Sequence, residues 1–175
     1  MLEFAKRRAD DGAAAILLGA IAGAAGTVAM TAAMRRIQAR LPQDDRYPLP
    51  PREIVESGLR KAGAEAPEGS MRSASVAAHF AYGAACGALY SALTHKGSLR
   101  SGSAYGLLVW AASYFGWLPA AGLLRPAHTH PLSRNLLMTA AHAVWGAATA
   151  GVLNELRAAR KTAFGDGPLK DAEGA

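Results

Sequence analysis

Four runs without a charged residue alternate with charge-rich segments along the chain. They cover residues 12–34, 73–94, 101–124 and 135–154. The hydrocarbon core of a bilayer is about 30 Å thick and takes roughly 20 helical residues to cross, so each run is long enough. Soluble helices of this length carry a charged face, which these runs lack. The pattern predicts an all-α membrane protein with four transmembrane helices rather than an alanine-rich soluble bundle.

The segments between and after these runs carry weaker structural signals. In the linker 35–72, residues 47–51 contain three prolines and are expected to be extended. Residues 52–62 then place apolar side chains on one face, which predicts a short amphipathic helix in the membrane interface. A solvated loop with a helical turn is the alternative. Pro119 is expected to kink the third helix near its end. The tail 155–175 is expected to begin as a basic helical extension and to end disordered.

One short pattern occurs twice. It reads Ala-Ala-His, then two residues, an aromatic residue and Gly-Ala-Ala. Its histidine is His79 in the first copy and His142 in the second. The aromatic residue and the glycine after it are Tyr82 and Gly83 in the first copy, and Trp145 and Gly146 in the second. We interpret residues 1–175 as one membrane domain built from two tandem two-helix repeats, over 12–94 and 101–154. A hairpin returns the chain to its starting side, so the two repeats are expected to be parallel.

Glycines at four-residue spacing extend the match to the first helix of each half. They are Gly19 and Gly23 in one half, and Gly102 and Gly106 in the other. Small residues let helix backbones approach closely in lipid, where the hydrophobic effect no longer drives helices together. We therefore expect these glycines to be helix-packing positions that align with each other between the two halves.

Both histidines of the repeated pattern lie inside predicted membrane helices, where ionisable side chains are uncommon and often functional. At 1.5 Å per residue, His79 and His142 are expected about 10 Å below the same membrane face. The loop 125–134 emerges on that face with His128 and His130, whereas His95 lies on the other side. The candidate site for packing or pH sensing comprises His79, Tyr82, Gly83, His142, Trp145 and Gly146.

Three uses of His79 and His142 are open. They can form interhelical hydrogen bonds that fix the packing. They can respond to protons, because histidine titrates near physiological pH. They can also bind a cofactor, either haem b held by both imidazoles or a transition metal shared with His128 and His130, although a His-x-His pair is a weak metal signal. The absence of a cofactor is the default expectation.

Other chemistry is sparsely represented. We find no GxSxG, HExxH, Walker A or dinucleotide-binding motif, and therefore expect no enzymatic activity. Cys86 is the single cysteine, so no intrachain disulfide can form. The net charge of +6 resides in segments that flank the apolar runs, which indicates lipid headgroups rather than nucleic acid as partners. A homo-oligomer is left open.

The aromatic stripe Trp110, Tyr114 and Trp117 is expected to serve packing and an interfacial belt rather than a ligand.

Several of these residues together resemble the YagU-like family of small bacterial inner-membrane proteins. The resemblance covers residues 12–154 and is carried by Gly19, Gly23 and Gly26, Pro50-Pro51-Arg52, His79 with Tyr82-Gly83, Tyr114-Phe115-Gly116-Trp117-Leu118-Pro119, and His142 with Trp145-Gly146. It implies a multi-pass protein of the bacterial inner membrane, without established enzymatic activity, that is linked to acid tolerance. The leading hypothesis is a stress-related membrane protein whose packing responds to protons, with small-solute or ion permeation. A haem- or metal-binding module and a structural subunit of a membrane complex are the alternatives.

Overall fold

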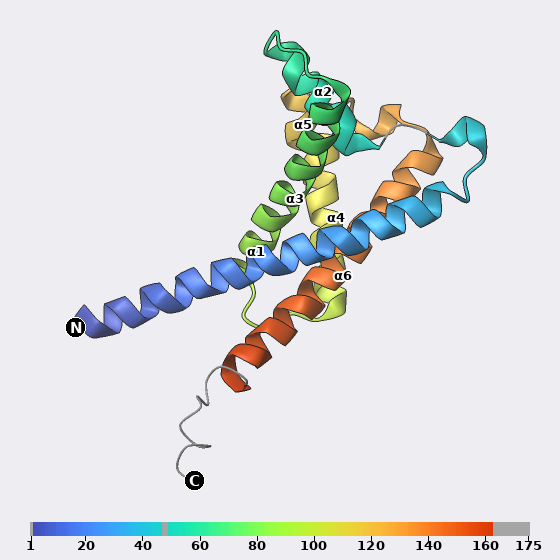
Figure 1. Ribbon diagram of the computed structural model, residues 1–175. Coiled ribbons are helices and arrows are strands. Elements are labelled where there is room, and N and C mark those ends of the chain that lie inside the picture. The colour runs from blue at the N-terminus through green and yellow to red at the C-terminus, as the bar shows by residue number, and fades with distance from the viewer. Residues whose placement is uncertain (1, 47–48, 163–175) are drawn as a thin grey trace, which may run out of the picture.

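The computed structural model describes residues 2–46 and 49–162, apart from the side chains of residues 2–10 and Asp45. The described residues form helices and connecting segments, with no strand among them (Figure 1). Three helices contain stretches long and apolar enough to cross a membrane: α1 (Leu2–Gln38) over Asp11–Gln38, α3 (Glu68–Leu93) and α6 (Leu132–Thr162). The predicted helical class and three of the predicted apolar helices are thereby confirmed.

The fourth apolar run forms an interrupted helix. It consists of α4 (Leu99–Ala111), the π-helical segment η2 (Ala112–Trp117) and the short helix α5 (Leu118–Ala120). Gly116 departs from helical dihedral angles, with φ −110° and ψ −107°. Pro119 follows three residues later, and a proline ring collides with the carbonyl of the preceding turn. The predicted kink therefore falls before Pro119, and the helix ends at Ala120 instead of residue 124.

The helix ends extend beyond the charge-free runs. α3 begins at Glu68 rather than 73, and α6 spans Leu132–Thr162 rather than 135–154. Arginine, lysine and glutamate are good helix formers, so a charge marks the edge of the apolar stretch and not the end of a helix. The predicted amphipathic helix exists as α2 (Pro50–Lys61). It begins two residues earlier than expected, so the prediction that Pro50 and Pro51 are extended is wrong: they form the first turn of the helix, where a missing N–H costs no hydrogen bond. Short 3₁₀ turns, η1 (Gln43–Asp45) and η3 (Ala127–Thr129), complete the fold. Residues 47–48 and the end of the tail lie outside the described residues.

α1 is the central helix of the bundle. It packs along α3 on one side and along α6 on the other, and α6 packs in turn against α4. The order across the molecule is therefore α3, α1, α6, α4, and the backbones of α3 and α4 are not in close contact. Figure 1 places η1, α2, α5 and η3 at one end and the α3–α4 link at the other. As expected, the long linker and the loop 125–134 share one end.

Glycines mark the three close helix crossings. A Cβ atom added at Gly23 would overlap the backbone of Gly83 and Gly87, and one added at Gly146 would overlap the backbone of Gly102. At the α1–α6 crossing, a Cβ atom on Gly26 would lie 2.9 Å from the carbonyl oxygen of Trp145. Such backbone contact is how small residues associate helices in lipid. The predicted packing role of the glycine pairs is confirmed.

The predicted alignment of those glycine pairs is wrong by one helical turn. Gly102 meets Gly146 and Ala150. With the halves aligned on their histidines, those positions correspond to Gly83 and Gly87, which Gly23 meets in the first half. Gly102 is therefore the counterpart of Gly23 and not of Gly19. Glycines spaced by four residues repeat once per turn, so the spacing alone fits both registers equally well.

Candidate functional site

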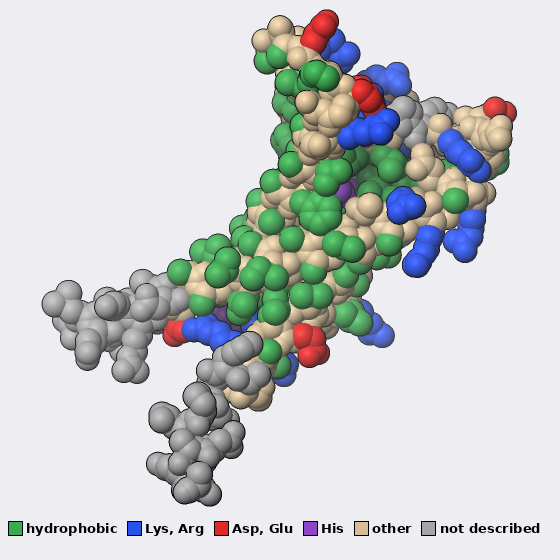
Figure 2. Space-filling view, viewed as in Figure 1, with side chains coloured by type: hydrophobic (Ala, Val, Ile, Leu, Met, Phe, Trp, Pro, Cys, Tyr) green, Lys and Arg blue, Asp and Glu red, His purple; other side chains and the backbone are tan. Residues whose placement is uncertain are grey.

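A cavity of about 280 Å³ lies where α3 and α4 separate. Side chains of α1 and α6 form its back wall, and α3 and the η2 segment form its sides. At the end of the bundle where η1, α5 and η3 lie, α2 covers the cavity with Pro50, Pro51 and Ile54. Figure 2 shows a hollow in this region of the surface, with a histidine side chain (purple) inside it. The lining residues are mostly apolar and aromatic.

Hydrogen-bonded side chains span the gap between α3 and η2. Ser113 Oγ donates to the carbonyl of Val109 at 2.7 Å. The hydroxyl of Tyr82, 2.9 Å away, therefore donates to Ser113. Trp117 Nε1 donates in turn to the Tyr82 oxygen at 3.3 Å. Bulky aromatic groups thus hold these two segments apart, whereas glycines bring the other three helix pairs together.

The aromatic residues of the third run do not form one stripe. The rings of Trp110 and Tyr114 lie 5.9 Å apart, but Trp117 packs on Tyr82 of α3 at 5.7 Å. A π-helical turn contains more residues than an α-helical turn, so it rotates Trp117 away from the face of the other two. Tyr114 is buried, as expected of a packing residue. Tyr114 and Trp117 also line the cavity, a role that sequence reasoning ranked second.

His142 lines the cavity from α6 and is buried. Its Nδ1 lies 2.8 Å from the carbonyl oxygen of Met138, one turn earlier. A carbonyl oxygen can only accept, so Nδ1 carries the proton and Nε2 of the neutral ring holds a lone pair. The ring of Tyr114 stands edge-on to His142, with 6.3 Å between centroids. The tautomer of His142 therefore leaves a hydrogen-bond acceptor at its Nε2 atom.

His79 lines the same cavity from α3 and is half-buried. Its Nε2 lies 3.4 Å from Thr31 Oγ1 on α1. The Thr31 hydroxyl donates its proton to the carbonyl of Thr27 at 2.8 Å, so His79 Nε2 is the donor toward Thr31. Five of the six residues predicted for the site line the cavity; Gly146 packs on Gly102 instead.

The two loop histidines lie at the same end of the bundle but apart from the cavity. His128 is exposed, whereas His130 is buried with Nε2 donating to the carbonyl of Arg125 at 3.0 Å. Burial, and then the positive charge of Arg134, lower the pKa of His130. The described residues contain no group of three or more His, Cys, Asp or Glu placed to hold a metal. The structure therefore does not join His128 and His130 to His79 and His142.

A buried ion pair fastens α2 over the cavity. Arg134, in the first turn of α6, is 8% exposed and donates from its Nη2 to Glu53 of α2 at 2.5 Å. The Nε atom of Arg134 is also buried and has no partner among the described residues. Removing the carboxylate would leave a buried guanidinium without its counter-charge. Sequence reasoning missed this pair because nothing local connects two opposite charges on separate helices.

Two further contacts hold α2. Arg52 donates through both Nη atoms to the carboxylate of Glu68 on α3, at 2.7 and 2.8 Å. Glu68 also accepts from Nε of Arg72 at 2.9 Å. Lys61 Nζ donates to the carbonyl of Ala121, just after α5. α2 is therefore tied to α6, to α3 and to the residue that follows α5, and we call α2 the lid because it covers one end of the cavity.

The size of the cavity bears on the cofactor alternatives. Pockets that hold drug-sized ligands measure about 300–1,000 Å³, and this cavity lies just below that range at about 280 Å³. A haem macrocycle would fit between His79 and His142 only if the helices moved apart.

Comparisons of the chain with protein-family models, with curated proteins and with solved structures find no match.

Proposed function

We propose that this chain is a multi-pass membrane protein, built from two parallel two-helix repeats, whose packing responds to protonation of His79 and His142. The repeat is supported by the shared glycine crossings of α1 with α3 and of α4 with α6. The bacterial inner membrane, a role in acid tolerance and the passage of a small solute or ion are parts of the proposal that come from the resemblance described above.

The two proposed repeats are not packed symmetrically. A two-fold axis would relate the α1–α6 pair to the α3–α4 pair. The first pair is in close backbone contact. The second pair is joined through side chains, such as Tyr105 of α4 donating to the carbonyl of Cys86 of α3, and the cavity lies between the two helices. Symmetry is thus broken at the cavity that both histidines line. A repeat of this kind allows a second arrangement, in which α3 packs against α4 and another helix pair separates.

The observation that carries the proposal is that His79 and His142 line one cavity with no acidic or basic side chain among its lining residues. The other titratable groups there, Tyr82, Cys86 and Tyr114, are uncharged in the neutral form that prevails below pH 7. A proton on either imidazole would therefore place an uncompensated cation among apolar groups. A second proton would add repulsion between like charges. Acid should consequently favour an arrangement that admits water.

The His79→Gln/His142→Gln double variant tests this. Glutamine keeps a hydrogen-bonding group but does not titrate. Between about pH 7 and about pH 4, we expect the wild-type bundle to lose about 1–3 kcal/mol of stability, the usual cost of a buried polar group without a partner. The double variant should lose clearly less. Thermal unfolding of the purified full chain in lipid nanodiscs measures the stability loss of the wild type and of the double variant.

His95→Gln is the matched control, because His95 is exposed at the other end of the bundle. It should keep the wild-type pH profile. If the double variant also keeps that profile, the histidines only support packing and the proposed proton response is wrong.

A further inference from the structure

We propose that the cavity binds a small, uncharged ring compound that carries a hydroxyl group, such as a phenol, and that this ligand enters from the lipid between α3 and η2. The proposal concerns the same cavity as the proton response and rests on the membrane placement proposed above. It does not require protonation, because it uses the neutral form of His142.

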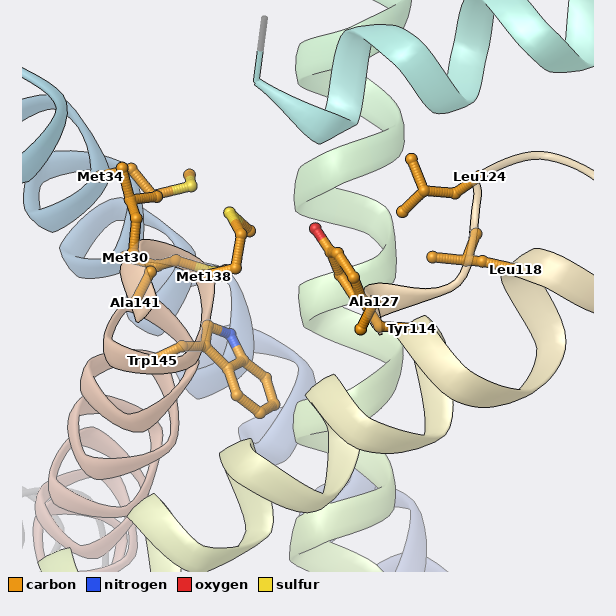
Figure 3. Close-up of a cluster of buried hydrophobic side chains, with 10 residues drawn as sticks. Met30, Met34, Tyr114, Leu118, Leu124, Ala127, Met138, Ala141 and Trp145 are labelled. Atoms are coloured by element: carbon orange, nitrogen blue, oxygen red, sulfur yellow. The ribbon is translucent and has the colours of Figure 1, made fainter. Parts of the chain in front are cut away.

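Tyr114 supplies the first polar group of this site. Its hydroxyl is buried and has no hydrogen-bond partner among the described residues, and the residue is only 3% exposed. Figure 3 shows the hydroxyl directed toward the space between the side chains of Met138 and Leu124. Buried hydroxyls in folded proteins are nearly always hydrogen-bonded. Tyr114 lines the cavity, and a ligand that displaces the side chains packed around its hydroxyl would supply the missing partner.

His142 supplies the second polar group. Because its Nδ1–H is used by the Met138 carbonyl, its Nε2 can accept one hydrogen bond. A ligand hydroxyl can donate to this Nε2, and its oxygen can accept from the Tyr114 hydroxyl once that group turns toward the ligand. A ketone would leave Nε2 unpaired, and a carboxylate would bring a charge that no lining side chain balances. The pair therefore selects for an alcohol or a phenol.

The remaining wall selects for a ring. Tyr82, Trp117 and Trp145 offer aromatic faces and edges, and Met30 and Met138 add adaptable thioethers. A volume of about 280 Å³ suits a ligand smaller than a drug-sized molecule. One or two fused rings with a hydroxyl at the deep end match both the size and the chemistry of the cavity.

The mouth of the cavity lies on an apolar part of the surface. Ala78, Tyr82 and Trp117 line the cavity and are also exposed, Tyr82 at 39% and Trp117 at 44%. All three belong to charge-free runs of the sequence, so in the proposed placement they face hydrocarbon. The π-helical segment that turns Trp117 toward Tyr82 is of a kind that occurs often at functional sites. A lipid-soluble compound would thus enter sideways past these two rings.

Binding of 2-naphthol and naphthalene to the full chain in nanodiscs tests the inference at neutral pH. The two probes share their rings, and naphthalene lacks the hydroxyl. Equilibrium dialysis against empty nanodiscs of the same lipid removes simple partitioning. We expect the protein to prefer 2-naphthol by about tenfold, and Tyr114→Phe and His142→Leu each to reduce that preference about threefold, the value of one hydrogen bond. His95→Gln should leave the preference unchanged.

Ala78→Phe provides a test that leaves the polar pair intact. A larger side chain at the exposed mouth should weaken the binding of both probes without changing their ratio. Equal binding of the two probes by the wild type would overturn the inference, as would an unchanged preference in a folded Tyr114→Phe variant. If the Tyr114 variant does not fold, unchanged binding in Ala78→Phe would overturn it. A missing 2-naphthol preference beside an intact histidine-dependent pH profile would overturn this inference alone.

Discussion

Gly146→Ala is expected to destabilise the bundle by at least about 3 kcal/mol, the upper end of the cost of overpacking. The added methyl group would overlap the carbonyl of Gly102 and would lie 2.9 Å from the backbone nitrogen of Gly106. These neighbours are backbone atoms, which cannot turn aside as a flexible side chain can. The α4–α6 crossing would have to separate. Unfolding of the purified chain in detergent, followed by circular dichroism, measures the loss.

Gly12→Ala is the matched control for this substitution. Gly12 also lies within a helix, and a Cβ atom added there meets nothing within 4 Å. Alanine is the better helix former by up to about 1 kcal/mol, so this variant should be as stable as the wild type or slightly more stable. A Gly146→Ala variant that unfolds like Gly12→Ala would mean that α4 and α6 are not in backbone contact.

Apolar periodicity could predict the helices but not how they are ordered in space. The charge-free runs located α1, α3 and α6 because a run of apolar residues is a local property. The separation of α3 from α4 is not local. It depends on Tyr82 and Trp117 meeting across a gap, whereas the glycine contacts close the other crossings. Each of these groups could have packed against a different helix without any change in the sequence pattern.

In the candidate site, too, the sequence predicted local features but not contacts between helices. The repeated pattern around His79 and His142 brought out most of the residues that line the cavity from α3 and α6. The pattern could not reveal that Tyr114 lacks a hydrogen-bond partner, because partners are known only once the neighbouring helices are placed. It also could not reveal the π-helical segment, although Gly116 and Pro119 together were a local sign of an irregular turn. Chemistry that arises between helices therefore had to come from the structure.

The lid offers a second large effect. Glu53→Gln is expected to cost about 2–4 kcal/mol and to release α2 from the bundle. The carboxylate is partly exposed, with a side-chain exposure of 33%, which moderates its own loss. Arg134, at 9%, would remain buried without a counter-charge, and removing one partner of such a pair typically costs about 3–5 kcal/mol. Amide hydrogen exchange along α2, combined with the unfolding measurement, would detect the release.

The double variant Glu53→Met/Arg134→Met distinguishes two costs in stability: that of losing the ion pair and that of leaving one buried charge without a partner. Apolar replacement of a buried ion pair is often close to neutral, so this variant should be more stable than Glu53→Gln and should keep α2 protected from exchange. Arg72→Ala, which breaks an exposed pair with Glu68, should change little. If Glu53→Gln and the double variant destabilise the chain equally, the cost lies in the lost contact itself. In that case Arg134 must reach water when its partner is removed, and the contact between Glu53 and Arg134 itself holds α2 over the cavity.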